Sequence, residues 1–213
     1  YGEATLICAP ASIPVPKAVA DRQRWGWMAQ MYSVRSSESW GVGDYGDLRH
    51  LLKDAAEKTH ADFMLINPIH ACAPIPPLEP SPYLPESRRF LNVTYIRPQD
   101  IAEYADLSES DKAEVARLHA QVSAANDDVN PMDINSAWCH KRQALKIIFR
   151  QPRSVERQSA FERFKEQAGP DLKAFAAWSV AFEVWGAPWE TSWFNDTNRD
   201  SPEVAGLIRE HAD

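Results

Sequence analysis

Residues 81–92 read SPYLPESRRFLN and bring a serine, a tyrosine and two adjacent arginines into one short stretch. Proline lacks an amide donor and clashes with a preceding helical turn, so this stretch cannot be a helix interior or a central strand. We expect a stiff loop that presents Ser81 and Tyr83. Arg88 and Arg89 have the geometry to hold a carboxylate by paired hydrogen bonds, although a salt bridge that fixes the loop is the better interpretation. Five prolines provide the stiffness: Pro74, Pro76, Pro77, Pro80 and Pro82.

Other polar residues invite a catalytic or ligand-binding interpretation. Asp44 and Asp47 resemble a pair of catalytic carboxylates, but they stand at the start of a helical pattern, where capping is the favoured role. Asn67 and His70 follow a short apolar run, and for them a structural role and ligand contact are equally open. No catalytic residue is assigned within the chain on this basis.

Metal and cofactor chemistry has no sequence signature here. The histidines outside position 70 lack ligand spacing: His50, His60, His119, His140 and His211. The three cysteines, Cys8, Cys72 and Cys139, are widely separated and odd in number, which does not suit a disulfide framework or a zinc site. We expect no metal and no cofactor.

Composition excludes two classes of partner. The formal net charge of -7 argues against a nucleic acid, because phosphate binding requires a basic surface. No apolar run approaches the ~20 residues that cross a bilayer, and the start of the chain does not resemble a secretory leader. We therefore expect a soluble protein of the cytoplasm with no membrane partner.

Hydrophobic patterning predicts an α/β opening. Residues 25–34 resemble a strand, residues 44–59 carry leucines and alanines at helical spacing, and residues 62–68 form a short apolar strand. A strand, a helix and a strand in this compact order predict a right-handed βαβ unit with parallel strands. Ligands of such sheets lie beyond the carboxyl ends of the strands, where residues 81–92 would then lie. A further strand is predicted at 91–96.

The rest of the chain is predicted to be helical. Helix starts are expected at Ser108 or Ser110, Asn135, Ser154, Pro170 and Ser201–Pro202. Two parallel strands cannot cover their own edges and faces, so either the helices wrap the sheet in an unusual way or the chain is a piece of a larger protein. If only these opening strands are present, we expect the chain to associate with itself. The β-like run at residues 1–10 suggests the last strand of an upstream domain.

Three ordered motifs carry a resemblance to a known family. WGWMAQMYSVRSSESWGVGDYGDL, LINPIHA and SPYLPESRRFLNVTYI resemble, in order and spacing, the bacterial 4-alpha-glucanotransferases, the amylomaltases or disproportionating enzymes of glycoside hydrolase family 77. The resemblance is strong over residues 24–96 and weaker beyond, where NDTNRDSPEVAGLIREHAD is similar to a helix start of longer members. Leu84 and Glu86 depart from the family's loop pattern, whereas Ser81 and Tyr83 are retained.

The resemblance implies a fold and a reaction. It implies the opening βαβ portion of a (β/α)8 TIM-type barrel with a mostly helical insertion, divided into 1–23 (upstream end and linker), 24–96 (first strands and site loops) and 97–213 (helical subdomain). It implies transfer of α-1,4-glucan segments between maltodextrins or starch-type glucans by retaining double displacement, with both catalytic carboxylates outside this segment. Alternatives are an α-glucan hydrolase of the same superfamily and a non-catalytic helical binding module. The implied substrate-binding residues are Ser81, Tyr83, Asn67, His70 and Arg88.

Overall fold

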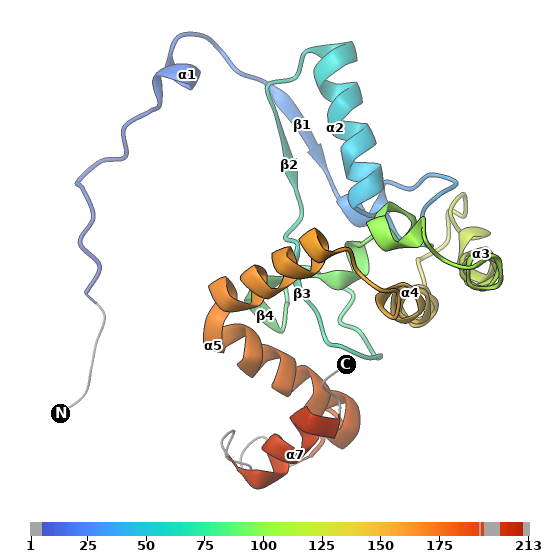
Figure 1. Ribbon diagram of the computed structural model, residues 1–213. Helices are drawn as coiled ribbons and strands as arrows, with labels where there is room; N and C mark the ends of the chain where they lie inside the picture. The colour runs from blue at the N-terminus through green and yellow to red at the C-terminus, as the bar shows by residue number, and fades with distance from the viewer. Residues whose placement is uncertain (1–5, 192, 194–200, 211–213) are drawn as a thin grey trace.

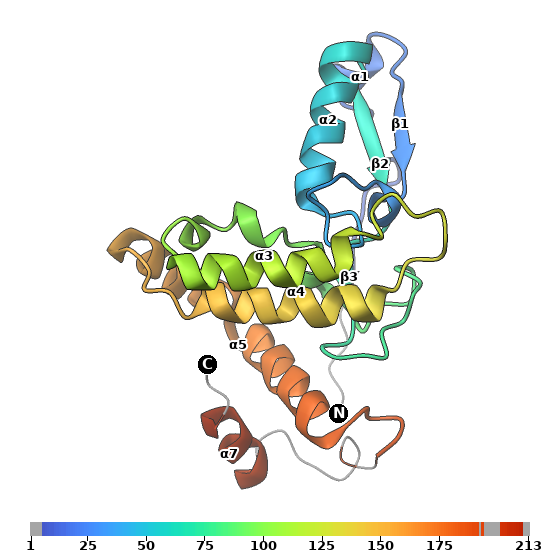
Figure 2. The same cartoon turned by 90° about the vertical axis from the view of Figure 1, so that its right-hand side faces the viewer.

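The computed structural model describes residues 6–191, 193 and 201–210. A β1–α2–β2 unit stands at one end, helices α3 and α4 cross the middle, and α5 runs from the middle to the other end, where α7 lies (Figures 1 and 2). Residues 6–24 form an exposed arm that contains only the short helix α1 (Lys17–Ala20). The strand predicted at the start is absent from residues 6–10, and its first five residues lie outside the described part.

The predicted βαβ unit is present with shorter strands. β1 (Gly26–Ala29) pairs in parallel with β2 (Phe63–Ile66), and α2 (Tyr45–Thr59) connects them. The Asp44 side chain accepts from the amides of Gly46 and Asp47, and Asp47 returns a contact to the Asp44 amide, which completes a capping box. The capping interpretation of these two aspartates is therefore confirmed. β1 ends early because the chain turns into the 3-10 helix η1 (Met31–Ser33).

A second small sheet follows β2. β3 (His70–Ala71) pairs antiparallel with β4 (Ser87–Leu91), and residues 72–86 between them form what we call the β3–β4 loop. The strand predicted at 91–96 is wrong, because Val93–Tyr95 is the 3-10 helix η2. The Asn92 side chain accepts from the Thr94 amide and turns the chain there. Arg88 and Arg89, which were expected in the loop, lie in β4.

The helical part packs around two neighbouring helices. α3 (Glu109–Ser123) and α4 (Ile134–Phe149) lie side by side (Figure 2) and share a core with the loop residue Trp40. Ser108 caps α3 as predicted, whereas α4 begins one residue early because Asp133 provides its cap. The short helices η3 (Pro98–Asp100) and η4 (Ala102–Tyr104) connect β4 to α3.

The last helices agree with the starts predicted at Ser154, Pro170 and Ser201–Pro202. α5 (Val155–Trp185) begins after the cap Ser154. It is broken at Gly169, immediately before Pro170, where the backbone has a φ of 63° that glycine adopts without steric cost. α7 (Pro202–Glu210) begins with the predicted proline. Residues 195–200 and 211–213 of the closing motif lie outside the described residues. None of the helices in the described ranges is both long enough and apolar enough to span a bilayer.

Candidate functional site

The β3–β4 loop is held at its base by backbone hydrogen bonds and at its tip by its own serine. The Glu86 amide donates to the Ala71 carbonyl at 3.0 Å, and the Asn92 amide donates to Ile69 at 2.9 Å. At the tip, Ser81 Oγ accepts from the Tyr83 amide at 3.4 Å, and its carbonyl accepts from the Leu84 amide at 3.1 Å. Ser81 therefore shapes the turn, and the Tyr83 side chain remains 56% exposed on it.

A cavity of about 320 Å³ lies between this loop and α4. Ser81 and His70 both line it, together with Cys72, Trp138 and Lys141. Tyr83 and Arg88 lie outside its lining and are exposed. The structure thus brings Ser81 and His70 together and leaves the tyrosine on the outer surface of the loop.

Asn67 occupies a different place from the other four candidate residues. It is 2% exposed, and its Oδ1 accepts from the Met31 amide at 2.7 Å. Its Nδ2 donates to the Tyr95 hydroxyl at 3.2 Å and to the Pro68 carbonyl at 2.9 Å. These bonds tie the segment after β1 to the end of β2, so the Asn67 amide serves the fold at this position.

The two arginines of β4 also separate. Arg89 Nη2 lies 2.5 Å from Asp171 Oδ2 in an ion pair that joins β4 to α5. Phe90 stacks on Phe175 beside it, with ring centroids 4.4 Å apart. Arg89 therefore forms the salt bridge that its sequence favoured, while Arg88 is exposed on the same strand.

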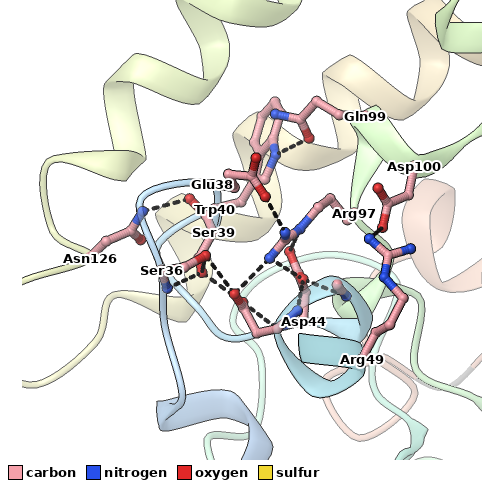
Figure 3. A network of polar contacts seen from close by, with 12 residues as sticks. Ser36, Glu38, Ser39, Trp40, Asp44, Arg49, Arg97, Gln99, Asp100 and Asn126 are labelled. Atoms are coloured by element: carbon pink, nitrogen blue, oxygen red, sulfur yellow. Dashed lines mark hydrogen bonds and ion pairs between the residues drawn. The ribbon is translucent and has the colours of Figure 1, made fainter. Parts of the chain in front are cut away.

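A buried polar network joins Arg97 to acidic residues that lie far from it in the sequence (Figure 3). No local pattern in the sequence predicts it. Arg97 is 3% exposed; its Nε donates to Asp44 Oδ2 at 3.1 Å and its Nη1 donates to Glu38 Oε2 at 2.8 Å. Its Nη2 lies 2.8 Å from Asp44 Oδ1 and 2.7 Å from Asp47 Oδ1, as ion pairs without hydrogen-bond geometry. Asp47 also accepts from the hydroxyls of Ser36 and Ser39, each at 2.6 Å.

Burial and hydrogen bonding push the two carboxyl groups of this network in opposite directions. Burial raises the pKa of Asp44, against the hydrogen bond from Arg97. Burial also acts to raise the pKa of Asp47, but the hydrogen bonds from Ser36 and Ser39 and the adjacent positive charge of Arg97 outweigh it, and the pKa is lowered. The network fixes the loop after β1, the start of α2 and the segment after η2 against one another.

Lys141 of α4 approaches the same network from the cavity side. It is 1% exposed, and its Nζ donates to the Thr94 carbonyl at 2.7 Å. Burial lowers the pKa of this ammonium to about 8, although Asp44 and Asp47 oppose the effect. Its contact is made across 47 residues, so neighbouring sequence gives no sign of it. Within the described residues, no group of three or more His, Cys, Asp or Glu side chains has the arrangement of a metal site.

Comparison with known proteins now decides the family. A family model described as 4-alpha-glucanotransferase matches residues 29–213. The chain belongs to this family. It is 39% identical over 216 aligned residues to the 4-alpha-glucanotransferases of Mycobacterium tuberculosis and Mycobacterium bovis, which cover 99% of this chain. A 4-alpha-glucanotransferase of Haemophilus influenzae is 32% identical over 174 residues, 78% of this chain and 25% of that protein.

A solved member of the family has the same fold over most of the chain. The crystal structure of amylomaltase from Corynebacterium glutamicum superposes with a TM-score of 0.72 at 38% identity and covers 87% of this chain. The chain spans 25% of that amylomaltase and 30% of the length of the mycobacterial relatives. The family and the mixed α/β fold are thus shown for this portion of a glucanotransferase sequence.

Proposed function

We propose that the complete polypeptide is a 4-alpha-glucanotransferase that transfers α-1,4-glucan segments between maltodextrins or starch-type glucans. The observation that carries the proposal is the family match over residues 29–213, within which the β3–β4 loop presents Ser81 and Tyr83. β1, α2 and β2 are the opening of a (β/α)8 barrel, and residues 97–213 are its helical subdomain. The supporting observation is the parallel pairing of β1 with β2 across α2.

The reaction is a retaining double displacement. A carboxylate attacks the anomeric carbon, a carboxylic acid protonates the departing glycosidic oxygen, and the 4-hydroxyl of a second glucan resolves the glucosyl-enzyme. Both carboxyl groups lie outside these 213 residues. The contribution of this chain is to hold the sugar: Tyr83 offers an exposed ring face, and Ser81 offers a hydroxyl group.

The other candidate residues support this site in different ways. His70 lines the cavity behind Ser81, Arg88 is exposed on β4 next to the loop, and Asn67 fixes the carboxyl end of β2. The three cysteines are free thiols, which supports a reducing compartment, the cytoplasm.

Product analysis tests the proposal. The complete polypeptide is incubated with maltotriose, and we expect glucose together with maltodextrins longer than the substrate. Glucose and maltose alone would identify a hydrolase, and no conversion would favour a binding module. The 213-residue chain serves as the control and should give no transfer, because it lacks both carboxyl groups. Transfer by the pure chain would overturn the placement of the catalytic pair.

A further inference from the structure

Three side chains on one face of α4 bind the backbone of the segment that contains the β3–β4 loop. Asn135 Oδ1 accepts from the Leu78 amide at 2.8 Å, Trp138 Nε1 donates to the Pro74 carbonyl at 2.8 Å, and Lys141 Nζ donates to Thr94 at 2.7 Å. Residues at spacings of three and six lie within a sector of about 120° on a helix. We call Asn135, Trp138 and Lys141 the α4 clamp.

The loop needs an external partner for its backbone. Pro74, Pro76 and Pro77 have no amide hydrogen, so this part of the chain cannot close its own ladder of hydrogen bonds. The Leu78 amide and the Pro74 carbonyl are instead satisfied by α4. The tip of the loop receives little packing of its own, because Tyr83 is 56% and Leu84 is 64% exposed. Beyond the hydrogen bonds that Ser81 makes within the turn, the rigidity of the tip therefore depends on the clamp and on the strand base.

Lys141 occupies a buried position, where its charge costs stability. A buried ammonium loses its hydration, and an apolar side chain of similar length would fill the same space without that penalty. Its single hydrogen bond goes to the backbone at the far end of the loop segment, and the carboxylates of Asp44 and Asp47 lie near enough to favour its charge. This arrangement suits a residue that fixes geometry rather than one that only fills the core.

We propose that the α4 clamp is a set of positioning residues through which the helical subdomain holds Ser81 and Tyr83 in the geometry that receives the sugar. The proposal rests on the proposed function. A loop fixed in advance loses less entropy when the substrate binds and places its groups at the reacting ring. In this proposal the clamp residues act through backbone groups: Asn135 and Trp138 through Leu78 and Pro74 of the loop, and Lys141 through Thr94 of η2.

Amide hydrogen exchange of the 213-residue chain tests the clamp without requiring activity. Trp138→Phe keeps the buried ring and removes only the donor to Pro74, and Asn135→Ala removes the acceptor for Leu78. One such hydrogen bond is worth about 1 kcal/mol, so exchange at the Tyr83 and Leu84 amides should rise by about fivefold. Neither of these two amides is bonded to the clamp, so faster exchange there reports that the tip of the loop has loosened, and not merely that one hydrogen bond was removed. The matched control is Gln143→Ala on the exposed side of α4, which should leave exchange at the tip unchanged.

Kinetics of the complete polypeptide test the positioning role. Lys141→Met should lower kcat/KM for maltotriose transfer by about tenfold, mostly in kcat, and Lys141→Arg should restore part of the loss because it keeps a donor. Exchange that rises only at Leu78, or equally in the control, would overturn the clamp. A loosened tip with unchanged kcat/KM would overturn the positioning role. Absence of transfer by the unmodified complete polypeptide would instead refute the proposed function, while the exchange result would still decide whether the clamp exists.

Discussion

Arg97 and Asp44 form an ion pair that is almost completely removed from water. The side chain of Asp44 is 0% exposed and that of Arg97 is 2% exposed, and they meet through Nε at 3.1 Å and Nη2 at 2.8 Å. Asp44 begins α2, whereas Arg97 follows η2, 53 residues later. The pair therefore joins the βαβ unit to the segment that leads into the helical part.

Loss of Arg97 should destabilise the protein far more than loss of an exposed arginine. Arg97→Met leaves Asp44 and Asp47 buried without their cation, so we expect a loss of about 3–5 kcal/mol in the free energy of unfolding, measured with urea. Arg49→Met is the control, because Arg49 pairs with Asp100 at 3.1 Å while 62% exposed, and it should cost about 0–1 kcal/mol. Equal losses of unfolding free energy in the two variants would show that the buried ion pair stabilises the protein no more than the exposed one.

Gly46 should tolerate no side chain while Arg97 is present. A Cβ at this position would lie 2.4 Å from both Cζ and Nε of the guanidinium. Gly46→Ala should therefore cost about 1–3 kcal/mol despite the better helix propensity of alanine. Gly206→Ala in α7 has no neighbour within 4 Å of the new Cβ and should be neutral or slightly stabilising.

The double variant Gly46→Ala/Arg97→Met tests whether the loss of stability in Gly46→Ala comes from a clash with Arg97 or from a cost of alanine at this position whatever its neighbours. The methionine side chain is flexible and makes room, so the two losses should be clearly less than additive. Full additivity, measured by the same urea titration, would contradict the proposed clash.

The contribution of Lys141 to stability should rise with pH. Burial lowers its pKa from 10.5 to about 8, so between these values the unfolded chain binds more protons than the folded chain. Stability that depends on this group therefore increases from pH 8 towards pH 10.5, by at most about 3 kcal/mol. Below pH 8 the full cost of the buried charge is present.

Comparison with Lys141→Met isolates this group. Its charged neighbours Asp44, Asp47 and Arg97 are present in both proteins. The Cys72 thiol has a pKa raised by burial to about 11, which weakens stability as the pH rises from 9 to 11, but it does so in both proteins. Between pH 8 and 10, the unfolding free energy of the unmodified protein should therefore rise relative to that of Lys141→Met. Parallel curves would exclude a shifted Lys141.

Local signals in the sequence were sufficient for the βαβ unit and for most helix starts, but not for the second sheet or for the contacts between elements. The capping pair Asp44–Asp47 and the leucine spacing after it identified α2, because both act within one helical turn. The strand predicted at 91–96 failed because the β-branched residues Val93 and Thr94 follow Asn92, whose side chain closes a tighter turn. The Arg97 network and the α4 clamp join residues 47 to 64 positions apart, so no local pattern could reveal them.

The open sheet should make the 213-residue chain associate with itself. Within the described part of the chain, β1 and β2 have no other strand neighbour, and Met28, Phe63 and Leu65 are 77%, 55% and 58% exposed. Unpaired edges and apolar faces of this kind favour association. Sedimentation velocity should show a mass that rises with concentration, and Leu65→Lys should reduce it. Val129→Lys, at a fully exposed apolar residue (99%) between α3 and α4, should have no effect. A monomer at every concentration would contradict the expectation.

Tyr83 is the aromatic side chain of the β3–β4 loop, and it is 56% exposed on the surface of the loop. In the complete polypeptide, Tyr83→Ala removes the flat face, and a loss of roughly 1–3 kcal/mol corresponds to about a ten- to hundredfold fall in kcat/KM for maltotriose transfer. The fall should appear mainly in kcat if the contact between Tyr83 and the sugar tightens as the sugar ring flattens towards the oxocarbenium-like transition state. Tyr83→Phe keeps the face and should be milder. Tyr83→Leu provides apolar volume without a flat face and should resemble alanine. If leucine were as active as phenylalanine, Tyr83 would only pack the loop, and the contact to the sugar would have to be assigned to Ser81 and the loop backbone.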